Sequence, residues 1–181
     1  MTTSIKNLIT MLVLVVTLTS CNQNPSLQTY FVDNELKPGF TSIDIPTSFL
    51  NIEETILTEE QKEAYNSIDK LNMLAFVVSE TNKVEYEIEL NKVKDILKDT
   101  KYQELMRGGN STDGKFIVKF IGEEDEIDEL ILFGNANDKG FAIIRVLGDD
   151  MNASKVAKLY SALDTSNINE SQITQFAEFF R

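Results

Sequence analysis

The order of patterned segments predicts an α+β domain: an antiparallel sheet of about five strands, two helices on one of its faces, and further helical segments at both ends. Three apolar runs of seven residues carry most of this prediction, because short polar turns separate them as in a three-stranded meander. They are 115–121, 127–133 and 141–147. Apolar residues also recur at helical spacing after Asn82 and again in residues 156–163, which indicates two amphipathic helices.

The other segments follow from local signals. Thr58 and Gln61 fit a capping box, which should open a helix that runs to about Asp69. A second capping-box signal lies at Asn82 and Glu85. Tyr30-Phe31-Val32 is ambiguous and could pair as a short strand. The remaining expectations are an extended segment at 40–45, strands at 71–78 and 102–107, a short helix at 48–57, and a last helix with Ile173, Phe176, Ala177 and Phe180 on one stripe.

Alternation divides the meander between two faces. One face is wholly apolar, and we expect the two amphipathic helices to cover it: Phe116, Val118, Phe120, Leu130, Leu132, Ala142, Ile144 and Val146. The other face mixes seven apolar residues with Lys119, Glu129 and Arg145, which the expected register aligns in one row. Its apolar patch is a candidate partner surface, formed by Ile131, Phe133, Phe141 and Ile143. Either the chain itself, through residues 40–69 or the C-terminal helix, or a partner or apolar ligand should cover this second face.

The first 21 residues read as a lipoprotein leader. Lys6 precedes an apolar run from Leu8 to Leu18, which is too short to span a bilayer and has the length of a signal-peptide core. A small residue, Ser20, then stands before Cys21, the one cysteine of the chain, as in the lipobox of bacterial lipoproteins. The expected organisation is a signal peptide at 1–20, a lipid anchor on Cys21 with a polar tether to 39, and one domain at 40–181.

Composition excludes several chemistries. The sequence has no histidine and a single cysteine, and its formal net charge is −12. Catalytic triads, imidazole bases, thiolate or imidazole metal sites and intramolecular disulfides are therefore excluded. So acidic a chain is not expected to bind nucleic acid, because it repels phosphate backbones.

Two acidic clusters should meet at one end of the meander and form a candidate calcium or magnesium site: Glu123, Glu124, Asp125, Glu126, Asp149 and Asp150. The alternative is a solvated turn, which we favour because the run matches no cation-binding loop. Ser67 and Lys70 match the S-x-x-K acylation motif, but the companion motifs are missing and the match is ascribed to chance.

Four strings carry a resemblance to a known family: residues 45–50, 102–107, 126–134 and 144–151. Together with the lipobox they resemble the bacteroidete lipoproteins catalogued as domain of unknown function 4252 (DUF4252), over roughly residues 40–165. The resemblance implies an envelope lipoprotein and brings no catalytic residue with it.

The sequence therefore predicts a non-enzymatic lipoprotein, anchored to the inner or outer membrane of a Gram-negative bacterium. Its expected partners are the membrane, through the anchor, and an envelope protein, in sensing or assembly. No cofactor is expected beyond the lipid on Cys21. The alternatives are a carrier of a small apolar ligand or divalent cation and, less favoured, a hydrolase that uses carboxylates or Ser and Lys.

Overall fold

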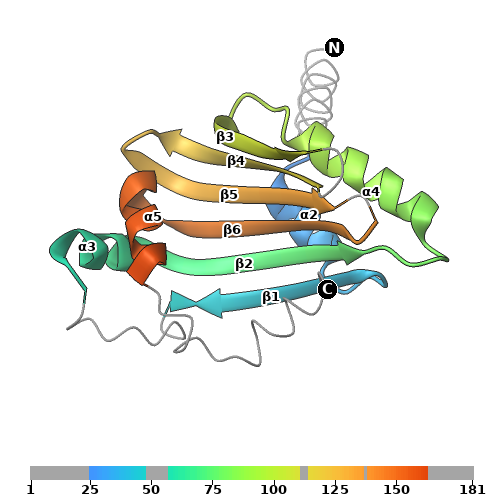
Figure 1. Cartoon of the computed structure of the whole chain (residues 1–181), viewed down its shortest axis with the longest axis horizontal. Helices are drawn as coiled ribbons and strands as arrows, with labels where there is room; N and C mark the ends of the chain where they lie inside the picture. The colour runs from blue at the N-terminus through green and yellow to red at the C-terminus, as the bar shows by residue number, and fades with distance from the viewer. Residues whose placement is uncertain (1–24, 48–56, 111–113, 137, 163–181) are drawn as a thin grey trace, which may run out of the picture.

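The computed structural model describes residues 25–47, 57–110, 114–136 and 138–162. In this part of the chain, four helices accompany one antiparallel sheet of six strands, in the order β1-β2-β6-β5-β4-β3 (Figure 1). The strands are β1 Phe40–Pro46, β2 Ile68–Val77, β3 Gln103–Asn110, β4 Gly114–Glu123, β5 Glu126–Ala136 and β6 Gly140–Met151. The helices are α2 Leu27–Asn34, α3 Glu59–Ser67, α4 Lys83–Ile96 and α5 Ala153–Ala162. The α+β class and the meander β4-β5-β6 are confirmed, and the sheet has one strand more than expected.

Of the two capping boxes that the sequence predicts, the structure contains one. The capping box at the start of α3 is confirmed, because the Thr58 hydroxyl accepts from the Gln61 N–H and the Gln61 side chain accepts from the Thr58 N–H. The second capping box is wrong. The Asn82 side chain makes no cap bond to α4 and donates instead to the Val77 carbonyl at 2.8 Å. The expected helices at 48–57 and around Ile173–Phe180 fall wholly or mostly outside the described residues.

Helix α2 corrects the prediction of a tether as far as residue 39. The Ser26 hydroxyl accepts from the Thr29 N–H and begins the helix, so Tyr30-Phe31-Val32 is helical and not a strand. Leu27, Tyr30 and Phe31 are buried in the main core. These apolar residues sit at i, i+3 and i+4, which places them on one side of the helix. The folded domain therefore begins before residue 40.

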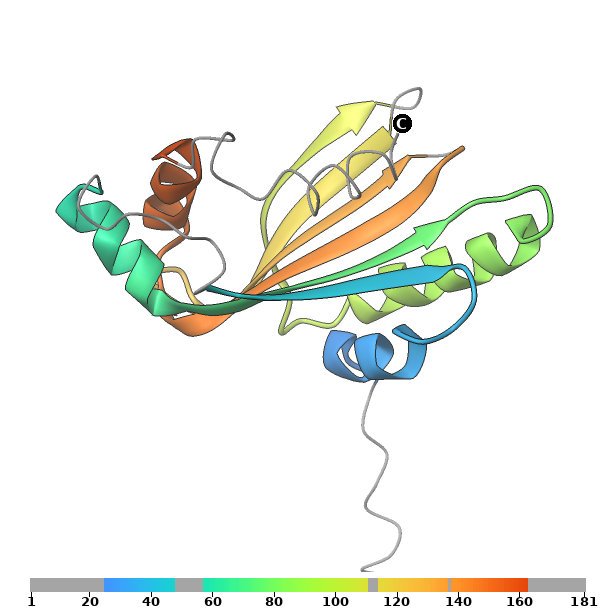
Figure 2. The same ribbon diagram turned by 90° about the horizontal axis from the view of Figure 1, so that it is seen from below.

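The helices cover the two faces of the sheet unequally. Helices α2 and α4 lie on one face, and α3 and α5 pack together at one end of the other face (Figure 2). The expectation of two helices on one and the same face is corrected by this arrangement: α4 covers the face that carries Glu129 and Arg145, whereas α5 covers part of the wholly apolar face.

The main core lies between the sheet and α2 and α4. Phe76 and Phe141 stack with their ring centroids 5.8 Å apart, and Tyr86 of α4 stacks on Phe141 at 6.2 Å. The face receives its cover from residues 27–34 and 83–96. Residues 40–69 were predicted to cover part of this face, and Phe40 does so, with its ring centroid 4.9 Å from that of Phe76. Ala64 and Ile68 of the same segment pack instead in a smaller core on the other face.

The predicted register is displaced by two residues in both hairpins. Lys119 lies opposite Ile131, and Ile131 lies opposite Arg145, so Glu129 is not directly opposite either base. Irregular pairing between Ile121 and Gly122, together with a short turn at 124–125, causes the displacement in the first hairpin. Gly122 permits this irregularity because its φ is +114°, a conformation that L side chains rarely adopt. A displacement by two residues leaves every side chain on its predicted face.

A buried ion pair explains how a charged face can become core. Arg145 Nε donates to Glu129 Oε1 at 2.6 Å and Nη2 donates to Oε2 at 3.0 Å. The guanidinium also donates to Gln28 Oε1 at 2.8 Å and lies 5.0 Å from the Phe31 ring centroid, both on α2. The predicted pairing of Glu129 with Arg145 is thus confirmed. Lys119 leaves the predicted row, because its ammonium donates to the Tyr102 carbonyl at 2.7 Å.

Candidate functional site

The half of the wholly apolar sheet face that lies beyond α3 and α5 is incompletely covered by the described residues; we call it the open face. One row of it crosses the whole sheet with one apolar residue from each strand: Ile43, Met73, Ile144, Leu132, Val118 and Met106. The next row holds Ala75, Ala142, Gly134 and Phe116. Leu132 is 39% exposed, Phe116 41% and Met106 54%. A sheet face that met only water would instead be largely polar.

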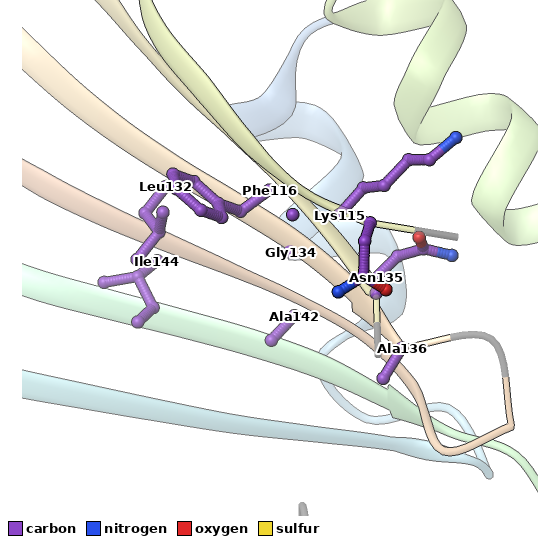
Figure 3. A pocket seen from close by; sticks show the side chains of 11 residues that line it. Lys115, Phe116, Leu132, Gly134, Asn135, Ala136, Ala142 and Ile144 are labelled. Atoms are coloured by element: carbon purple, nitrogen blue, oxygen red, sulfur yellow. The ribbon is translucent and has the colours of Figure 1, made fainter. Parts of the chain in front are cut away.

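The second of these rows hollows the open face. Ala142 and Gly134 form a low floor between the larger side chains of Phe116, Leu132 and Ile144 (Figure 3). The hollow has a volume of about 560 Å³. A Cβ placed on Gly134 would meet no atom of the described residues within 4 Å, so these residues leave the space above this glycine open.

The described residues that line the hollow provide apolar contacts and few reactive groups. Among the described residues that line it, Lys115 alone is titratable. Figure 3 shows its side chain running toward α4, away from the hollow. Its register agrees, because Lys115 lies opposite Asn135, which donates to the Tyr86 hydroxyl on α4 at 2.9 Å. The lining therefore provides apolar burial without a general acid or base.

The predicted partner surface is corrected by the structure. Ile131, Phe133, Phe141 and Ile143 are each at most 6% exposed and belong to the core beneath α2 and α4. Burial gain scales with the apolar area removed from water. The face with Phe76, Phe133 and Phe141 therefore gains more from a helix than the face with Ala75, Gly134 and Ala142.

The acidic candidate site gains no support. Glu123 and Glu126 are paired across the turn of the β4–β5 hairpin, and Asp125 accepts from the Asn152 amide at 3.2 Å. All six acidic side chains are exposed. Within the described ranges, no three carboxyl, imidazole or thiol groups come close enough to hold a metal ion. A solvated turn stays the favoured prediction for these residues, with a cation site as its alternative.

The other candidate residues lie apart from the open face. Ser67 ends α3, and its hydroxyl donates to the Ala64 carbonyl at 3.0 Å, while Lys70 is exposed on β2. Cys21 and the leader fall outside the described residues. None of the helices that the structure does describe has the length and hydropathy needed to cross a membrane.

Comparison with known proteins gives one finding. The family model described as a domain of unknown function (DUF4252) matches residues 35–159. No curated protein and no solved structure matches the chain.

Proposed function

The chain belongs to the DUF4252 family, and we propose that it is a non-enzymatic lipoprotein of the bacterial cell envelope that binds another envelope protein through the open face. The main observation behind this proposal is the apolar row that crosses all six strands, with Leu132 and the neighbouring Phe116 left exposed. Monomeric proteins rarely expose a contiguous apolar area of this kind unless something binds there. A partner that presents an apolar stripe fits this surface.

The position of α2 supports a protein as the partner. Helix α2 is the first described element, and it packs on the face opposite the open face (Figure 2). An anchor on Cys21 reaches the domain through this helix. The open face is then directed away from the attachment point, toward molecules in the surrounding compartment. We therefore propose anchorage in the envelope of a Gram-negative bacterium, as the resemblance to bacteroidete lipoproteins implies.

A photo-crosslinking residue at Leu132 tests the interaction. Benzoylphenylalanine at this position, in the full chain in its native envelope, should capture a discrete protein that mass spectrometry identifies. Val84 is the matched control, because it is an exposed aliphatic residue, at 78%, on α4 of the other face. Capture from Val84 but not from Leu132, or from neither, would refute an interaction through the open face.

The anchor has its own test. Cys21→Ser removes the thiol that would accept the lipid, so metabolic labelling with a clickable fatty acid should be lost and unprocessed precursor should accumulate. Labelling that survives in the Ser variant would refute the lipoprotein proposal. This result would leave the open face untouched, because α2 and the sheet begin after Cys21.

The hollow favours a second candidate function, the carriage of a small apolar ligand. Its volume of about 560 Å³ falls within the range of ligand pockets. Gly134→Leu tests ligand carriage separately from protein binding, because it fills the open space above the glycine. A carrier should lose a bound fatty-acid probe in this variant, as measured by native mass spectrometry. If the wild-type chain binds no such probe, this candidate is refuted.

A further inference from the structure

The open face has a candidate occupant in the chain itself. We propose that residues 163–181 bind the open face of the free protein and must leave it before a partner binds; the second clause rests on the proposed function. The inference joins an apolar surface that the described residues leave exposed with an apolar segment that follows directly in the sequence.

Helix α5 lies on the same side of the sheet as the open face. Its Leu159 is 3% exposed and packs with Phe120 and Ile127 in a second, smaller core between the sheet and helices α3 and α5. Phe120 belongs to the row that adjoins the open face, because it lies opposite Leu130 one step before the pair of Val118 and Leu132. The chain therefore passes beyond Ala162 at the border of the open face.

The segment after α5 carries a matching apolar stripe. Ile173, Phe176, Ala177 and Phe180 recur at i, i+3, i+4 and i+7, which places them along one side of a helix of about two turns. A helix this short is marginal in water unless its apolar side is buried. The open face offers that burial, since its low floor of Ala142 and Gly134 admits large side chains.

The connection is long enough. From the Val146 row, which borders α5, to Ala142 in the hollow the sheet extends roughly 13 Å, at about 3.3 Å per strand residue. The ten residues 163–172 span about 33 Å when extended. The stripe can therefore reach the hollow with length to spare.

Charge favours the same destination. Residues 163–181 contain three acidic residues and one basic residue, in a chain whose net charge is −12. Most of such a surface repels an acidic segment. Among the described residues that line the hollow none is acidic, so docking there avoids the repulsion.

Photo-crosslinking in the purified full chain tests the inference. At dilute concentration, benzoylphenylalanine at Leu132 should crosslink within the same molecule to peptides from 163–181, and the same probe at Val84 should not. Phe176→Asp combined with Phe180→Asp should lower the yield about tenfold or more, since each buried aromatic contributes at least that factor. Phe179→Asp is the matched control, because the helical spacing puts Phe179 off the stripe, and it should keep the yield.

The outcomes separate this inference from the proposed function. Absence of the intramolecular crosslink, or its replacement by a crosslink to a second copy, overturns the inference while leaving partner capture in the envelope a separate measurement. If the inference holds, the double Asp variant should capture more envelope partner than the wild type. An intramolecular crosslink with no partner captured by either chain would refute the proposed function and assign the segment the part of a permanent cover, which overturns the requirement that it leave.

Discussion

Arg145→Met should be one of the most damaging single substitutions in the sheet. Arg145 is 3% exposed, makes two hydrogen bonds to Glu129 and one to Gln28, and lies over the Phe31 ring. Methionine fills similar space but leaves the Glu129 carboxylate buried without its base. Breaking a buried pair from one side costs about 3–5 kcal/mol, which is a large part of the about 5–15 kcal/mol that stabilises a typical domain.

A double-mutant cycle isolates the charge effect. In the Glu129→Leu/Arg145→Met chain both charges are gone, so its free energy of unfolding should return to within about 1–2 kcal/mol of the wild type. Urea unfolding of the purified Cys21→Ser chain, followed by circular dichroism, measures all four corners of the cycle. Gln28→Ala removes one bond from a side chain that is itself exposed and should cost under about 1.5 kcal/mol. The reasoning is refuted if Arg145→Met costs less than about 1 kcal/mol, or if the double variant loses the sum of the two single losses.

Three further predictions concern pH, backbone and metal. Burial, with the hydrogen bond to Glu89, raises the pKa of Tyr30 far above its usual value near 10. The folded chain then keeps a proton that the unfolded chain releases, so stability falls as the pH rises above about 10, and urea midpoints should fall less steeply for Tyr30→Phe. Gly140→Ala should lower the urea midpoint sharply, because its φ is +135° and the new Cβ would lie 1.9 Å from a backbone oxygen, whereas Gly134→Ala should be tolerated; similar losses would contradict this. Calcium at about 1 mM should barely move the melting temperature if the acidic turn is only solvated, and a rise of many degrees that Asp149→Asn abolishes would establish a cation site.

The sequence predicted the strands well because alternation is a local signal. Each of the three meander strands lies where the apolar runs placed it, and both faces hold the residues assigned to them. The register was harder to predict, because one irregular step at Gly122 displaces the first hairpin by two residues while the residues assigned to each face stay there. Helix α2 was missed although its signal was present: Ser26 precedes Leu27, Tyr30 and Phe31 at helical spacing.

The predicted partner surface was placed on the wrong face of the sheet for a different reason. Counting charges on each face favoured the uncharged face as the helix-covered core, and this choice placed the partner surface on Ile131, Phe133, Phe141 and Ile143. Two considerations reverse it: Glu129 and Arg145 satisfy each other when buried, and aromatic side chains gain more from burial than small ones. Apolar area, taken together with the ability of charges to pair, would have identified the open face.

The strand order also has a consequence for how the molecule assembles. Strands β3 to β6 are joined in sequence and pair with their neighbours, as β1 and β2 do across a somewhat longer connection, whereas β2 and β6 pair although some sixty residues separate Val77 from Gly140. Closing a loop of that length costs about 3 kcal/mol more in entropy than closing a hairpin turn. We expect the meander to organise first and the seam between Leu74 and Ile143 to close late in folding. Weakening this seam would then mainly speed unfolding, while weakening the meander would slow folding.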